Sequence, residues 1–95
     1  MKEEEVAAVR VPLGWLYRRR KADGLTKENL EFFSARYSDD AKRNIYHAVM
    51  QVLEHPEVDV LALMPYLPYT NDELRRYLVA VRDAIKPVVE ALDGK

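Results

Sequence analysis

The chain has 95 residues, 48% of them hydrophobic, which is enough for one domain with a single core and too little for two. Fifteen basic residues face sixteen acidic ones, and the net charge of −1 excludes bulk attraction to nucleic acid while leaving a local basic patch open. The absence of cysteine excludes disulfides and thiolate chemistry and favours a cytoplasmic location. The start MKEEEVAAVRV lacks the pattern of a signal peptide, and no apolar run approaches the ~18 residues of a membrane span.

The first predicted element is a short helix that follows Pro12 and closes at Ala22, on the spacing of Leu13, Leu16 and Tyr17. Residues 1–11, before it, form a segment that could be flexible. The last turn of this helix would carry four consecutive cations: Arg18, Arg19, Arg20 and Lys21. Cations stabilise the negative end of a helix, so a solvated helix end is the preferred interpretation. The alternatives are that the run binds nucleic acid together with Arg43, or an acidic protein partner.

Two helices are predicted next from their N-terminal signals. Thr26 and Ser38 are natural N-caps, because each hydroxyl can accept a hydrogen bond from an unpaired amide of the first turn. The first helix should cover residues 27–37, and the second should stop at residue 54 or 55, since the residue before Pro56 is biased away from helix. Two faces are expected on the second helix, an apolar one of Ala41, Ile45, Ala48, Val49 and Val52, and a mostly polar one of Lys42, Arg43, His47, Gln51 and Glu54.

The segment VDVLALM, residues 58–64, is apolar at six of seven positions. A lone strand would have no partner in this chain, so we predict one or two helical turns with Pro56 as the first residue. Because no face of the segment is polar, it should be buried on most sides, Leu61 included.

A long last helix is predicted after a capping box formed by Thr70 and Glu73. Pro87 should kink this helix or split it after Lys86, and Gly94 should end it. Its apolar stripe is the strongest periodic signal in the chain: Leu74, Tyr77, Leu78, Val81, Ile85, Val88, Val89 and Leu92.

The stretch MPYLPY places Tyr66 and Tyr69 on a loop that two prolines stiffen. Rigid loops lose little entropy on docking, and aromatic residues beside arginine are enriched in binding hot spots. The candidate partner-binding surface is therefore Tyr66, Tyr69, Arg75 and Arg76. In the competing interpretation Tyr69 packs against Leu74 as a hydrophobic staple and Tyr66 is tucked against Met64. Of the two tyrosines, Tyr66 is expected to be the exposed one.

Catalytic, metal and DNA-reading motifs are poorly represented. His47 and His55 are eight residues apart and form no His-x-x-x-His or Glu-x-x-His pair, so we expect no metal, no cofactor and no enzyme activity. The polar face around Arg43 and His47 has residue types that read base edges, as in a helix-turn-helix. Asp39 and Asp40 at the end of that helix nearest the DNA would repel phosphates, so an ordinary solvated face is preferred.

Two resemblances accompany these patterns. The stretch VLEHPEVDVLALMPY resembles the nuclease-colicin immunity proteins, four-helix domains with Glu-His-Pro after the second helix and a short third helix that ends in proline. Glu54, His55, Pro56 and Pro65 match, whereas Leu63 and Met64 stand where that family has adjacent toxin-binding tyrosines. The pieces GWL, RYSDD, VDV, LP and DELRRYL resemble a family of small helical bundles of unknown function, which implies the fold alone.

Together these patterns predict an all-α protein, a single compact bundle of about five helices over residues 1–95. The favoured function is a small non-catalytic module that binds another protein without a cofactor. A nucleic-acid-binding protein that uses the basic run and an immunity-type inhibitor of a toxin stay open as alternatives. A homo-oligomer is also open, and no membrane partner is expected.

Overall fold

Five α-helices follow one another in the computed structural model, which describes residues 2–16 and 24–93. They are α1 (Glu3–Gly14), α2 (Lys27–Arg36), α3 (Asp39–Glu54), α4 (Val60–Leu63) and α5 (Asn71–Asp93). The described residues contain no strand, so the prediction of an all-α bundle is confirmed. The radius of gyration is 12.5 Å, close to the ~12 Å expected of a compact domain of this length.

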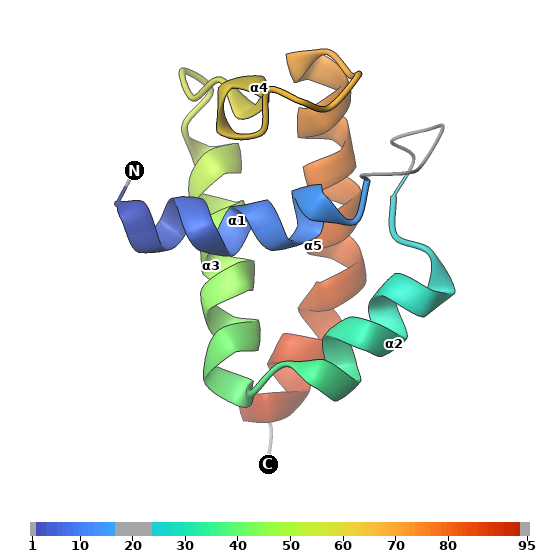
Figure 1. The fold of residues 1–95 in the computed structure, drawn as a ribbon. Coiled ribbons are helices and arrows are strands. Elements are labelled where there is room, and N and C mark those ends of the chain that lie inside the picture. Colours follow the sequence, from blue (N-terminus) through green and yellow to red (C-terminus); the bar gives the residue numbers. More distant parts are fainter. Residues whose placement is uncertain (1, 17–23, 94–95) are drawn as a thin grey trace.

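The two longest helices, α3 and α5, lie side by side and run in opposite directions (Figure 1). α1 crosses in front of both at a steep angle, α2 lies against the lower part of α5, and the single turn α4 covers the upper end. Every other helix therefore packs on α5, and α1 also packs closely on α3.

The core forms where the apolar stripes of these helices meet. On α5 the predicted stripe is buried at six positions, Leu74, Tyr77, Leu78, Val81, Ile85 and Val89. The predicted apolar face of α3 supplies Ile45, Ala48, Val49 and Val52, while Ala41 is only half-buried. Burying these side chains removes apolar surface from water, which is the main favourable term in folding.

The predicted N-terminal caps are present. The Asn29 amide donates to Thr26 Oγ1 at 3.1 Å, and the Ala41 amide donates to Ser38 Oγ at 3.2 Å. At the start of α5 the capping box is complete, because the Glu73 amide donates to Thr70 Oγ1 and the Thr70 amide donates to Glu73 Oε1, both at 3.1 Å. These bonds satisfy amides that have no partner within their own helix.

The first helix differs from its prediction. α1 begins at Glu3, so most of residues 1–11 is helical, and Pro12 lies inside the helix instead of preceding it. Pro12 lacks an amide proton and costs one helical hydrogen bond, but it lies near the C-terminal end, where little helix is left to break. Val9 lies at helical spacing before Leu13 and Leu16, and all three are buried. This spacing could have predicted that the helix begins before Pro12.

The short fourth helix is also later and less buried than predicted. Pro56 lies in a turn, and α4 begins at Val60 with Asp59 as its N-cap, whose carboxylate accepts from the Leu61 amide at 3.1 Å. Only Val60 is fully buried, and Leu61 is half-buried. A single turn at the end of the bundle has neighbours on one side only, which is why the apolar run is not enclosed.

Two further features of the long helices differ from expectation. Lys42 was placed on the polar face of α3 but is only 8% exposed. Of the two effects expected of Pro87, a kink or a split, the split does not occur, because α5 is continuous from Asn71 to Asp93. The carbonyl that loses its helical donor belongs to Asp83, four residues earlier, and both Asp83 and Pro87 are exposed, so water can satisfy it.

Candidate functional site

The two tyrosines of the proline-stiffened loop have opposite environments. Tyr66 is 83% exposed, which confirms the expectation that it is the exposed one. Tyr69 is 8% exposed and belongs to the core, as does Leu74, which is fully buried. The burial of both residues is consistent with a hydrophobic staple between them. Only Tyr66 is thus free to contact a partner.

The loop that carries Tyr66 is held in place on both sides. Leu67 and Tyr69 are buried, and the Leu67 amide donates to the Met64 carbonyl at 3.2 Å. On the other side, Arg10 Nε of α1 donates to the Leu63 carbonyl at 2.9 Å. These anchors and the prolines beside Tyr66 restrict the backbone that presents the ring.

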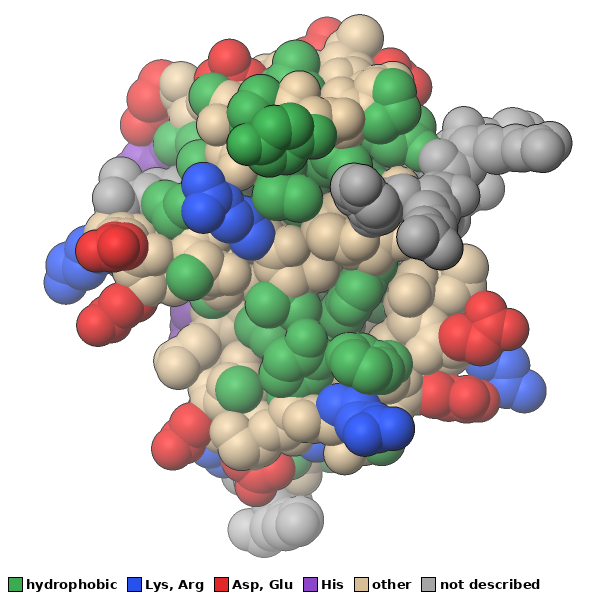
Figure 2. Space-filling model, viewed as in Figure 1, with side chains coloured by type: hydrophobic (Ala, Val, Ile, Leu, Met, Phe, Trp, Pro, Cys, Tyr) green, Lys and Arg blue, Asp and Glu red, His purple; other side chains and the backbone are tan. Residues whose placement is uncertain are grey.

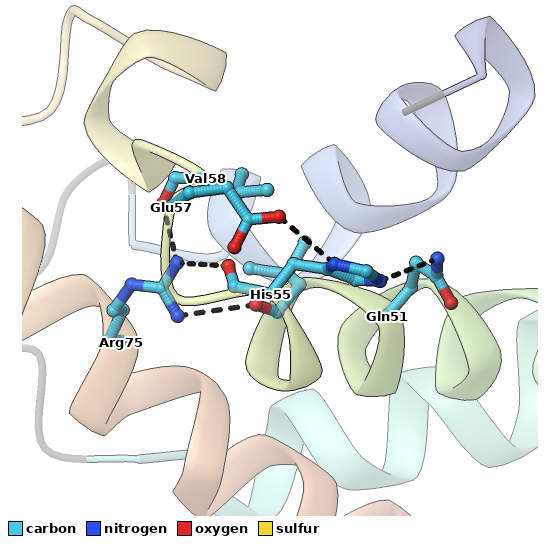
Figure 3. Close-up of polar contacts among 6 residues, drawn as sticks. Gln51, His55, Glu57, Val58 and Arg75 are labelled. Carbon is cyan, nitrogen blue, oxygen red and sulfur yellow. Dashed lines mark hydrogen bonds and ion pairs between the residues drawn. The ribbon is translucent and has the colours of Figure 1, made fainter.

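Arg75 does not flank Tyr66 but closes the C-terminal end of α3 (Figure 3). Its Nη1 donates to the Val52 carbonyl at 3.2 Å, and its Nη2 donates to the carbonyls of His55, at 2.8 Å, and Val58. Carbonyls at a helix C-terminus lack partners within the helix and carry negative partial charge, so a guanidinium is well suited to them. The contacts assign Arg75 to structure, since its donors are directed into the protein.

Arg76 is exposed and takes a different direction from its neighbour. Consecutive residues on a helix are about 100° apart around the axis, because one turn takes about 3.6 residues. The four residues proposed from the sequence, Tyr66, Tyr69, Arg75 and Arg76, therefore do not form one surface. Tyr66 and Arg76 are its exposed members.

His55 links the end of α3 to the loop that follows (Figure 3). Gln51 Nε2 lies 3.2 Å from His55 Nε2, and His55 Nδ1 lies 3.0 Å from Glu57 Oε1. With the Gln51 amide as donor, His55 accepts at Nε2 and donates from Nδ1 to the carboxylate. A hydrogen bond from its own backbone amide, followed by the His55 ring, holds the pKa of Glu57 below its ordinary value.

The basic run proposed for nucleic acid, Arg18, Arg19, Arg20 and Lys21, lies outside the described residues. Arg43, which was proposed to act together with this run, is half-buried on α3 and pairs with Asp40 at 3.3 Å. Asp40 is one of the two carboxylates at the start of α3 that would face a phosphate backbone.

Two hollows flank the crossing of α1 over α3, and neither was predicted from the sequence. One, of about 220 Å³, is lined by Glu4, Glu5, Ala8, Asn44, His47, Ala48 and Gln51. The other, of about 280 Å³, is lined by Glu4, Ala7, Ala8, Val11, Tyr37, Ala41, Asn44 and Ile45. The sequence alone could not predict these hollows, because residues of α1 form one wall of each and the position of α1 on α3 is a tertiary feature.

Residues 2–16 and 24–93 hold no group of three or more His, Cys, Asp or Glu side chains able to share a metal ion. Within the same residues, no helix has both the length and the apolar character needed to cross a membrane.

Comparison of the chain with family models, with curated proteins and with solved structures found no match in any of the three. The resemblances to immunity proteins and to the small helical bundles of unknown function accordingly stay predictions.

Proposed function

We propose that this protein is a non-catalytic binding module for another protein, with Tyr66 as the anchor of the contact. The observation that carries the proposal is the 83% exposure of a tyrosine on a restrained loop. The other described tyrosines, Tyr37, Tyr46, Tyr69 and Tyr77, are buried or half-buried. Tyr66 therefore differs from the other described tyrosines in that its side chain is exposed to solvent.

A partner that binds Tyr66 meets a low entropic cost. Tyrosine offers a large apolar ring with few rotatable bonds and a hydroxyl that can hydrogen-bond, which is why it is enriched at binding hot spots. The buried Leu67 and Tyr69 already fix the backbone on one side of the ring. Less freedom is then lost when a partner closes over Tyr66 than if the loop were unrestrained.

The proposal is tested by photo-crosslinking followed by affinity measurement. A benzophenone amino acid replaces Tyr66 in native cells, and a parallel chain carries it in place of Phe32, an aromatic that is 46% exposed on α2. We expect a discrete adduct from position 66 that is absent from position 32.

The captured protein is then purified and titrated with three variants. Tyr66→Ala should weaken binding at least tenfold, Tyr66→Phe should retain most of the affinity, and Phe32→Ala should bind like the wild type. All three should unfold at nearly the wild-type temperature. The proposal is wrong if position 66 gives no discrete adduct, or if Tyr66→Ala binds as tightly as the wild type.

A further inference from the structure

The hollow on one side of α1 combines an apolar floor with hydrogen-bond acceptors. Ala8 and Ala48 form the floor, and their short side chains leave space that longer ones would fill. The polar lining consists of the carboxylates of Glu4 and Glu5 and the side chains of Asn44, His47 and Gln51. Because the Gln51 nitrogen already donates to His55, its oxygen is the atom left to accept.

The hollow on the other side of α1 is mainly apolar. Its walls are Val11 of α1, Ile45 of α3 and Tyr37 at the junction between α2 and α3. Figure 2 shows apolar side chains gathered on this face below α1, with acidic side chains at the left edge, by the N-terminal end of that helix. Both hollows are open to solvent, and their volumes of about 220 Å³ and about 280 Å³ leave room for a side chain.

The two hollows adjoin at the crossing of α1 and α3, because Glu4, Ala8 and Asn44 line both. A ligand that fills both must carry an apolar group and a hydrogen-bond donor group close together. A chain segment meets this condition with two side chains, whereas a small polar molecule would leave the apolar hollow empty.

The negative charge of the glutamates at the N-terminal end of α1 favours a positively charged donor group in the ligand. Within the described residues, Glu3, Glu4 and Glu5 take part in no ion pair, and Arg43 of α3 pairs with Asp40 at 3.3 Å. Part of this acidity stabilises the N-terminus of α1. Arginine is the complementary side chain, since its guanidinium has five donors and no acceptor, and its alkyl stem can lie along an apolar floor.

We propose that these paired hollows dock a segment of a partner protein that carries an arginine close to a large apolar side chain. The guanidinium lies in the hollow that Glu4 and Glu5 line, with its stem over Ala8 and Ala48. The apolar side chain fills the hollow beside Val11, on the other side of α1. This site does not rest on Tyr66 and is a second recognition surface.

The test uses two blocked alanine-based peptides as probes, each with a leucine four residues from either arginine or citrulline. Citrulline keeps the shape of arginine and removes its charge. Each peptide is titrated into the ¹⁵N-labelled full chain and followed by amide chemical shifts. We expect the arginine peptide to shift signals of residues 4–11 and 44–51, and the citrulline peptide to bind at least fivefold more weakly.

Protein variants provide the matching arm of the experiment. The double change Glu4→Gln and Glu5→Gln should weaken the arginine peptide at least fivefold. Glu28→Gln, a change of the same kind in the first turn of α2, should leave the affinity unchanged. Tyr66→Ala should also leave it unchanged, which separates this proposal from the function proposed for the loop.

Several outcomes would overturn the proposal. Equal binding of the two peptides to the wild type would do so even if the double variant failed to fold. Shifts scattered over the whole domain, or equal loss of affinity in Glu28→Gln, would remove the site from the crossing of α1 and α3. Concentration-dependent shifts of the same amides without peptide would assign the hollows to a second copy of this chain instead.

Discussion

Arg75 illustrates how a charged side chain can serve the fold when its partners are backbone atoms. Its guanidinium joins α5 to the end of α3 and to the loop before α4 through three carbonyls. Its Nε is buried and makes no hydrogen bond within the described residues, so the donors that face the carbonyls carry the whole interaction. Truncation would leave those carbonyls without this donor in a place partly shielded from water.

The neighbouring arginines give a matched pair for testing that role. Arg75→Ala should lower the free energy of unfolding by about 1.5–3 kcal/mol, the range for hydrogen bonds that involve a charged group. Arg76→Ala, one residue along and exposed, should change it by less than about 0.5 kcal/mol. Urea denaturation followed by circular dichroism measures both. Equal effects of the two changes would contradict the structural role of Arg75.

At the scale of elements, the start of α3 depends on a single hydroxyl. Ser38 accepts from the Ala41 amide at 3.2 Å, and Asp39 and Asp40 follow in the first turn, where negative charge is favourable. The same chain offers a second exposed serine, Ser34, inside α2, where it has no capping role. Identical changes at the two positions can therefore separate capping from intrinsic helix propensity.

Ser38→Ala should destabilise the protein by about 0.5–2 kcal/mol, because the first turn of α3 loses its cap. Ser34→Ala should be neutral or slightly stabilising, since alanine favours a helix interior more than serine does. Thermal unfolding of the two variants side by side gives the comparison. A loss of stability at Ser34 as large as that at Ser38 would show that capping is not the cause.

The prolines of α1 and α5 mark the limit of prediction for whole elements. From sequence, a proline predicts a break or a kink, and this expectation placed the start of the first helix after Pro12 and a kink or split of the last one at Pro87. Both helices nevertheless continue through their proline. The reason is tertiary: the buried residues on each side, Val9 and Leu13 in one helix and Ile85 and Val89 in the other, are held in the same core.

At the scale of the whole molecule, stability depends on the stripe of α5, on which the other four helices pack. Leu78 lies in this stripe and is fully buried, whereas its neighbour Val79 is 38% exposed. Leu78→Ala should cost about 2–5 kcal/mol, because it removes buried methyl groups and leaves a cavity. Val79→Ala should cost much less, since most of that change takes place in water.

The Leu78→Ala variant also tests whether the bundle unfolds as one unit. Denaturation of the Leu78→Ala variant should follow one transition, at the same midpoint by the aromatic and the far-ultraviolet circular dichroism signals, as in a two-state domain. Separate midpoints, or a small effect of Leu78→Ala, would show that α5 does not join the helices into one core.

The sequence by itself determined where most helices begin and which residues form the central stripe. Thr26, Ser38 and Thr70 cap amides only three residues away, and the stripe of α5 depends on the periodicity of a single helix, so these signals are local. The exposure of Tyr66 was also predictable, because its neighbour Tyr69 had a local packing partner in Leu74.

Only the tertiary structure decided which polar side chains stay in water and which surfaces remain open. Arg75 meets carbonyls 17 to 23 residues away, and Lys42 is buried although its helical position is polar by pattern. The paired hollows exist because α1 crosses α3 and brings residues 4–11 against residues 41–51. A crossing is set by the packing of whole helices, so periodicity within either segment carries no information about it.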